Sequence, residues 1–276
     1  MKQVDGSQAV RMRYDPCQIF AQSKSPAGLY ARKKWLGEAL RPVWQNDFDE
    51  TVQSLLDGQS ADGSWSQDPV ETIRRLFGLH LTVREKTGEI LKAMEWLGRE
   101  TLNYDLSGTY FDDIPAAALR ELPFVNARQS LLLVCATLFL ASVFGLENNE
   151  RTEAHYRLLS SWLVTGKDNE EVWSEKSNIL RALVVSPVYS QNPDTHGLVA
   201  DLENHQKPSG LWPAPIPFFL TVNALAHLDA ESAQRQWRKA LPLLAGAQQK
   251  DGGWGSDERE WNTFLVVHAL KNKHCL

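Results

Sequence analysis

The residues with the clearest capacity for chemistry are carboxylic acids at the expected starts of helices. They are Asp49, Asp112, Asp113, Asp257 and Glu260. A carboxylic acid that is buried enough to stay protonated near neutral pH can donate a proton to an alkene. The same acids stabilise a helix when they cap it or lie in its first turn. The sequence therefore leaves two roles open for them, catalytic acid and helix cap.

Two short acidic clusters favour the capping role. Asp49 lies in the run 47–50, and we expect an acid of this run to cap a helix over 51–56. The pair Asp112-Asp113 comes just before Pro115, which is typical of another helix start. This pair also lacks the third carboxylate of a DDxxD magnesium site. Capping is the interpretation that we favour at both places, and acid catalysis is the alternative.

Three histidines, His80, His227 and His268, each follow a tryptophan by fourteen or fifteen residues. Equivalent positions of a structural repeat face equivalent directions, so we expect these side chains to approach one rim of a shared cavity. There they would handle protons, whereas the ordinary alternative is a histidine near a helix C-terminus. The chain has no HExxH pattern. We predict no metal site and no cofactor.

Aromatic side chains lie in or beside three apolar segments that have helical spacing. They are Phe139, Phe218, Phe219, Trp261 and Phe264. Such rings either fill a core or line a cavity, where they exclude water and stabilise cations through their π faces. In the second case these rings, together with His227 and His268, are predicted to contact an apolar ligand.

An internal repeat indicates which elements position these residues. A glutamine is followed four residues later by glycine and six residues later by tryptophan in Gln59-Gly63-Trp65, Gln206-Gly210-Trp212 and Gln248-Gly252-Trp254. The glycine can take the positive φ of a helix stop, and the glutamine amide can bond carbonyls left open at a helix end. An apolar segment of helical spacing follows each block. The repeating unit is therefore a helix hairpin, and we predict that each glutamine braces neighbouring helix ends and that each tryptophan is a buried structural residue.

These blocks resemble the QW repeats of the prenyltransferase and squalene-cyclase superfamily. The resemblance implies an all-α fold, the α/α toroid, in which helix hairpins close into an inner and an outer ring. The last two repeat tryptophans are 42 residues apart, and at that period the 276 residues hold roughly six hairpins. Between Trp65 and Trp212 the signature is not visible, and the fold is predicted there by extrapolation.

The chemistry that this resemblance implies is not matched by the motifs of the chain. Protein prenyltransferases hold zinc through an Asp-x-Cys pair and a histidine, but the chain has no Asp-x-Cys, and Asn262 occupies the position that resembles the histidine. Triterpene cyclases use a DxDD motif, to which only the run 47–50 is similar. The sequence therefore predicts that no catalytic zinc is bound and leaves catalysis unproven.

The helices themselves can be assigned to the two rings by their apolar patterns. The segment 128–145 is apolar on all sides, so we expect an inner helix that is buried all round. Inner helices are also expected at 216–228 and 261–271, and amphipathic outer helices at 86–99, 151–164 and 232–245. No alternating apolar and polar pattern predicts a sheet. We predict one domain over 1–276, with 1–40 as an N-terminal extension or first hairpin.

The net charge and the cysteine content limit which binding partners and which cellular compartment we expect. A formal net charge of −5 with scattered basic residues argues against a nucleic-acid partner. Three widely spaced cysteines favour a reducing cytoplasm over a disulfide framework. The longest apolar run, 130–146, is too short for a comfortable membrane span. Peripheral membrane contact stays open, and the oligomeric state is not predicted.

Three functional hypotheses remain at this point. The first is a terpene cyclase-like or prenyltransferase-like protein that binds an apolar, isoprenoid-like molecule in a central cavity. The second is a non-catalytic toroid that acts as a scaffold or binding protein. The third is an (α/α)-barrel enzyme that acts on carbohydrates with paired carboxylates. The lining of the ring's centre distinguishes the three hypotheses. A cyclase needs aromatic walls and one buried acid, and a scaffold has a centre filled by side chains. A carbohydrate-active enzyme needs an open, solvated and acidic cavity.

Overall fold

A computed structural model describes residues 12–103, 114–165 and 172–276. Within these ranges the chain forms eleven α-helices and three short 3-10 helices, and no strand. The all-α prediction is confirmed. In the same part of the chain, no helix is long and apolar enough to cross a membrane.

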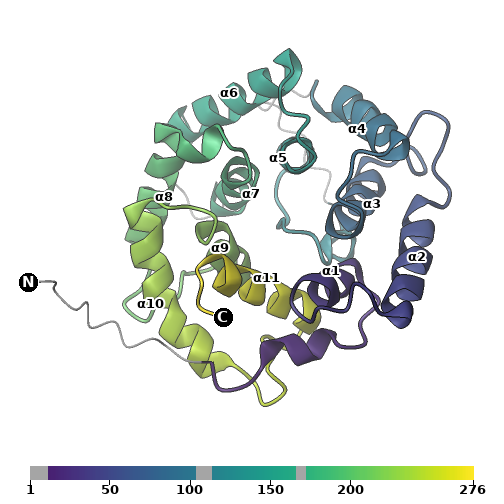
Figure 1. Cartoon of the computed structure of the whole chain (residues 1–276). Coiled ribbons are helices and arrows are strands. Elements are labelled where there is room, and N and C mark those ends of the chain that lie inside the picture. The colour runs from purple at the N-terminus through teal and green to yellow at the C-terminus, as the bar shows by residue number, and fades with distance from the viewer. Residues whose placement is uncertain (1–11, 104–113, 166–171) are drawn as a thin grey trace, which may run out of the picture.

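Every second helix, beginning with the first, belongs to an inner set (Figure 1). The inner helices are α1 (Pro26–Lys34), α3 (Pro69–Thr82), α5 (Gln129–Val143), α7 (Val172–Val184), α9 (Phe218–Leu225) and α11 (Arg259–Asn272). Each of them contacts the next, and α11 contacts α1, so the inner set closes on itself. We call this closed set the ring, and the space that it surrounds the ring centre.

The remaining helices lie outside the ring. They are α2 (Pro42–Leu56), α4 (Gly88–Thr101), α6 (Glu150–Thr165), α8 (Pro193–His205) and α10 (Glu231–Ala247). A 3-10 helix, η1 (Pro16–Phe20), contacts both α1 and α11, and two others are η2 (Ala116–Leu119) and η3 (Tyr189–Gln191). Each outer helix is followed by an inner one, so the hairpin unit predicted from the repeat is present.

The apolar patterns assigned the helices to the correct layers. All residues from Leu131 to Ser142 of α5 are buried, as expected for a segment that is apolar on every side. The predicted amphipathic segments became α4, α6 and α10, which lie outside. Their polar faces need solvent, whereas α5 can satisfy its whole surface only between its neighbours in the ring and the outer helices.

Each glutamine of the three repeat blocks holds two backbone carbonyls. Its amide donates to the carbonyl of the glycine four residues later in its own block, at 2.9–3.0 Å. It also donates to a carbonyl of the next outer element: Glu89 in α4, Gln236 in α10 and Tyr14 just before η1. The predicted brace is confirmed, and the third brace ties the C-terminal part of the chain to its N-terminal part.

The glycines and tryptophans of these blocks are structural for a visible reason. Gly63, Gly210 and Gly252 have φ of +97°, +92° and +89°. A Cβ at Gly210 would lie 2.2 Å from the carbonyl oxygen of Lys239, so only glycine lets the turn approach the next helix. The tryptophans of all three blocks are at most 3% exposed, which confirms that they are buried.

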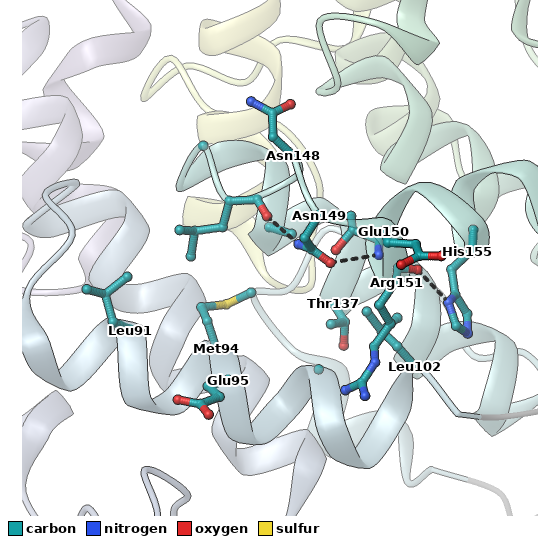
Figure 2. Close-up of a pocket in the computed structure, with 16 residues that line it drawn as sticks. Leu91, Met94, Glu95, Leu102, Thr137, Asn148, Asn149, Glu150, Arg151 and His155 are labelled. Carbon is teal, nitrogen blue, oxygen red and sulfur yellow. Dashed lines mark hydrogen bonds between the residues drawn. The ribbon is translucent and has the colours of Figure 1, made fainter.

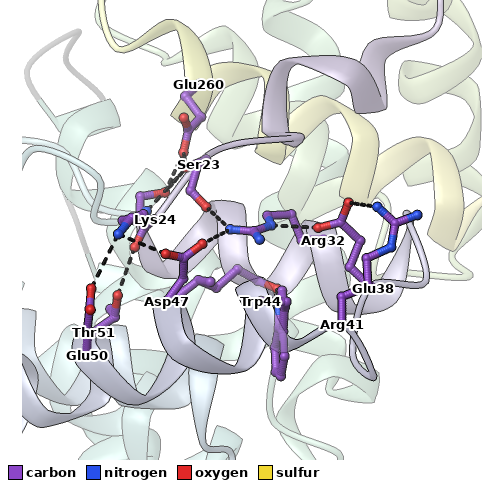
Figure 3. Close-up of polar contacts among 12 residues, drawn as sticks. Ser23, Lys24, Arg32, Glu38, Arg41, Trp44, Asp47, Glu50, Thr51 and Glu260 are labelled. Carbon is purple, nitrogen blue, oxygen red and sulfur yellow. Dashed lines mark hydrogen bonds and ion pairs between the residues drawn. The ribbon is translucent and has the colours of Figure 1, made fainter.

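The helix predicted over 51–56 begins earlier than expected. It is α2, which starts at Pro42, so the acids at 47 and 49 lie inside the helix and cap nothing. Proline is favoured at the first helical position, and this signal outweighs the acidic run. Asp47 is instead 2.8 Å from both Arg32 and Lys24 (Figure 3).

Candidate functional site

Side chains from all six inner helices meet in one contact network. The residues are Tyr30, Phe77, His80, Phe139, Arg181, Asn223, Trp261, Phe264 and His268, with Trp35 and His227 just beyond α1 and α9. The rings of Phe77 on α3 and Trp261 on α11 are 5.7 Å apart. Because α1 lies between α3 and α11 in the ring, this contact joins two inner helices that are not direct neighbours.

Three of the predicted aromatic residues pack together at this place. Trp261 stacks on Phe264 with ring centroids 5.3 Å apart, and Phe139 reaches Phe77 at 5.9 Å. All four side chains are at most 5% exposed. The middle of the ring is therefore filled by aromatic side chains that pack against one another.

The other two predicted rings, Phe218 and Phe219, lie at one mouth of the ring. They line a cavity of about 310 Å³ together with Phe124 and Trp261. This mouth is formed by the N-terminal ends of α9 and α11. Trp261 belongs both to the cavity and to the central network, so the cavity ends on the aromatic surface of the ring centre.

One buried arginine lies within this aromatic surface, whereas Arg84, which lies over the ring of Tyr30 at 5.5 Å, is exposed. Arg181 on α7 is 7% exposed, and its guanidinium lies over the ring of Phe139 at 5.2 Å. Its one hydrogen-bond acceptor in the described structure is Oδ1 of Asn223, at 2.6 Å. Its Nε is buried without a partner, and no described carboxylate pairs with it. Burial lowers the pKa of Arg181 to about 10, so the group is a buried cation at neutral pH.

The side chain of Asn223 lies between Arg181 and His268 and contacts both. Since Oδ1 accepts from Arg181, the amide nitrogen of Asn223 faces the other way. It donates to the carbonyl of Leu265 at 2.9 Å and lies 3.4 Å from Nδ1 of His268. In this arrangement Nδ1 of His268 accepts, and its proton sits on Nε2.

Two of the three histidines singled out by the repeat are neighbours, whereas His80 packs against Phe77, Phe139 and Phe144. The rings of His227 and His268 are 5.3 Å apart. Burial, and then the charges of Arg84 and Arg181, lower the pKa of His80 to about 3. Burial also lowers the pKa of His268 to about 4, and that of His227 well below its usual value. All three are therefore neutral at pH 7, and among the described residues Nδ1 of His80 and Nε2 of His227 have no hydrogen-bond partner.

The predicted acids are placed elsewhere. Asp49 and Asp257 are exposed. Glu260 is half-buried between α11 and the start of α1, where Ser23 donates to it at 2.7 Å and Ser25 also donates (Figure 3). Asp112 and Asp113 lie outside the described residues. Burial and two glutamate charges raise the pKa of another acid, Glu121. It lies in the chain between Arg120 and Leu122, which line the 310 Å³ cavity, but does not line it itself.

Sequence reasoning missed Arg181, Asn223 and the aromatic residues of α1 and α3. A signal for Arg181 was present, because it is the only charged residue in the apolar stretch 179–185. A cation in such a stretch is either paired or functional. Asn223 gave a similar signal, because it is a polar residue buried in the apolar helix α9, where its amide needs hydrogen-bond partners.

A second and larger cavity lies outside the ring. It measures about 920 Å³ and opens between α4 and α6, with Thr137 and Ala141 of α5 among its lining residues (Figure 2). Met94 and Leu102 contribute apolar walls, whereas polar side chains such as His155 come from α6. In the described ranges, no group of three or more His, Cys, Asp or Glu side chains is arranged to hold a metal ion.

Comparison with known proteins supports the fold alone. No protein-family model and no curated protein matches the chain. The structure is similar to a solved structure described as a protein from Actinoplanes, with a TM-score of 0.52 and 17% sequence identity. The similarity covers 94% of this chain and 88% of the other. The helical architecture is thus shared over nearly the full length of both proteins.

Proposed function

We propose that the ring centre binds a small molecule that combines an apolar body with an anionic group. An isoprenoid-like chain that carries a phosphate or carboxylate is the class that fits. The observation that carries this proposal is Arg181, a buried cation with no described carboxylate partner. A buried charge without a counter-ion is strongly unfavourable, and a bound anion would remove that cost.

The surroundings of Arg181 fit both halves of such a ligand. Phe139, Trp261 and Phe264 offer apolar surface. Of these three, only Trp261 also lines the cavity of about 310 Å³, which Arg181 does not line. The unpartnered nitrogens of His80 and His227 add hydrogen-bonding groups. Pockets with mainly aromatic walls and a few placed polar groups are typical of small-molecule sites.

Two earlier alternatives are less well supported by this centre. A cyclase that starts by proton donation needs a buried acid, and the described candidates lie at the surface or between α11 and α1. A carbohydrate-active enzyme needs two facing carboxylates, and the described central network contains none. A scaffold whose centre is simply filled would explain the packed rings but not the unpaired Arg181.

Binding of farnesyl diphosphate and of its neutral counterpart farnesol tests the proposal. Isothermal titration calorimetry should detect farnesyl diphosphate binding to the unmodified protein. Arg181→Gln should weaken it by about 30-fold or more, because the charge pair is lost in a buried site. Affinity for farnesol should change little.

Arg235→Gln is the matched control. Arg235 is an exposed arginine that pairs with Glu203 on the outer surface, so its loss changes the net charge equally. This variant should bind farnesyl diphosphate as the unmodified protein does. Equal affinity for the diphosphate and for farnesol would refute the anionic half of the proposal, and no binding of either would favour the scaffold.

A further inference from the structure

We infer that His80 and His227 are binding residues for the anionic group, and that binding of the anion is accompanied by uptake of protons from solvent onto their imidazoles. This inference rests on the proposed function, since it concerns the same site. It adds two recognition residues and a pH dependence that the unpaired arginine alone does not imply.

Ring contacts and hydrogen bonds connect both imidazoles to Arg181 through one shared neighbour or a short chain of neighbours. His80 is near the C-terminal end of α3, and His227 follows α9. Arg181 lies over the ring of Phe139 at 5.2 Å, and the ring of His80 is 6.2 Å from the same ring. His227 lies 5.3 Å from His268, which contacts Asn223, the hydrogen-bond partner of Arg181. Nδ1 of His80, Nε2 of His227 and Nε of Arg181 are all buried and unpartnered in the described structure. Buried polar atoms of a native protein normally have a partner, so three together indicate a missing one.

His80 is surrounded by groups that oppose its protonation. It faces Arg84 at the end of its own helix, Arg181 from α7 and His268 from α11. The rings of Phe77, Phe139 and Phe144 pack against it and exclude water. The ligand-free site therefore holds His80 neutral through desolvation and positive charge.

His227 has a similar environment. Arg181, His268 and Lys273 are the charged or titratable groups that face it, and each lowers its pKa. In the described structure no carboxylate raises the pKa of either His80 or His227. Both imidazoles are thus neutral only as long as the site holds no anion.

A bound anion reverses the sign of the local field. An opposite charge within a few ångströms favours the protonated form, and the effect is strong where water is excluded. Each imidazole then forms a new N–H bond with a proton given up by a buffer acid. The resulting imidazolium donates a charge-assisted hydrogen bond to the anion. By linkage, an affinity that takes up one proton rises tenfold for each unit that the pH falls.

The probe for this inference is 1-decanesulfonate below its micelle concentration. Its sulfonate does not titrate between pH 5.5 and 7.5, so every pH effect belongs to the protein. We expect calorimetry in two buffers of different ionisation enthalpy to show net proton uptake near pH 6. Affinity should rise by about tenfold or more between pH 7.5 and pH 5.5.

Variants assign the protons to residues. His80→Gln and His227→Gln each keep a hydrogen-bonding amide but cannot be protonated, so each should reduce the uptake, and the double variant should abolish it. His205→Gln is the control, because this partly buried histidine lies at the end of the outer helix α8 and packs at a tilt against Trp173. It should leave the uptake unchanged. If a glutamine variant does not fold, the imidazole carbon shifts of the unmodified protein, with and without probe, report the same protons.

The outcomes separate the two proposals. Binding with equal affinity at all pH values and no uptake would overturn this inference while supporting the anion site. Uptake that persists in the folded double variant would overturn the assignment to these two histidines. No binding of decanesulfonate at any pH, to protein that is folded by circular dichroism, would overturn both.

Discussion

Two buried arginines on this ring show opposite kinds of environment. Arg32 of α1 is 2% exposed and donates to Glu38 and Asp47 at 2.8 Å each, and to the carbonyl of Ser23 at 3.0 Å (Figure 3). Arg181 of α7 is 7% exposed and has a single described acceptor, the amide of Asn223. The first arginine has two counter-charges, and the second has none among the described residues.

This difference distinguishes a structural ion-pair network around Arg32 from the site that we propose around Arg181. Around Arg32, the partners are themselves held: Lys24 pairs with Asp47, and Arg41 pairs with Glu38. Such a network fixes α1 against α2 and is complete without any other molecule. The site around Arg181 is incomplete in the same sense, because its donors outnumber its acceptors. The complete network of Arg32 is structural, and the open guanidinium of Arg181 is the feature on which the proposed anion site rests.

The largest effect is expected where the satisfied network is broken. Arg32→Met leaves Glu38 and Asp47 buried without their main partner, and we expect a loss of about 3–5 kcal/mol in unfolding free energy. Chemical denaturation measures it. A loss below about 1 kcal/mol would mean that the network contributes little, and the contrast with Arg181 would lose its structural half.

The repeat turns give the next largest effect. Gly210→Ala places a Cβ 2.2 Å from the carbonyl of Lys239 at a φ of +92°, and we expect it to cost about 2–4 kcal/mol. Gly197→Ala is the control, since a Cβ at this position of α8 meets nothing within 4 Å. It should stabilise the helix by about 0.5–1 kcal/mol. Similar thermal shifts in both variants would contradict the structural role of the turn.

The contrast between the two arginines is clearest if removing Arg181 raises the stability of the ligand-free protein, whereas removing Arg32 lowers it. Arg181→Met removes a buried charge that has no counter-ion, so the ligand-free protein should become more stable by about 1–4 kcal/mol. The same variant should lose anion binding. If Arg181→Met instead destabilises the ligand-free protein as much as Arg32→Met does, Arg181 is structural and the proposed site is wrong.

The buried histidines of the ring centre should make the protein less stable at acidic pH. The folded pKa of His268, about 4, lies below the unfolded value of 6.5. The unfolded chain therefore binds this proton first, and the associated stability is complete above pH 6.5 and lost as the pH falls towards 4. Removing this titration with His268→Gln should lower the slope of stability against pH by about 1.4 kcal/mol per unit between pH 6 and 4.5. Parallel curves for the two proteins would show that His268 is solvated rather than buried.

The sequence predicted what repeats and little of what occurs once. Gln59, Gly63 and Trp65 were recognisable because the same local problem, a turn pressed against the next helix, is solved three times with the same residues. The layers of α4, α5, α6, α9, α10 and α11 followed from their apolar patterns. The start of α2 was predicted at residue 51 instead of Pro42, which gave Asp49 a capping role that it does not have.

The site was harder to predict because its members come from every inner helix. Phe139, Trp261 and Phe264 were named as ligand contacts, and the structure brings them together. The unpaired state of Arg181 depends on what α5, α9 and α11 place beside it. A single chain without an alignment does not reveal that no acid faces a given arginine.

The third glutamine brace has a consequence for how the chain folds. The first two braces join residues 30 positions apart, so each can form as soon as its own hairpin and the next outer helix exist. Gln248 instead bonds Tyr14, 234 positions away. Loop closure over that length brings a large entropic cost and a slow search, so the contact that completes the circle is expected to be late in folding. During synthesis, Tyr14 leaves the ribosome 234 residues before Gln248, so its backbone carbonyl stays without this partner while the residues between them are made.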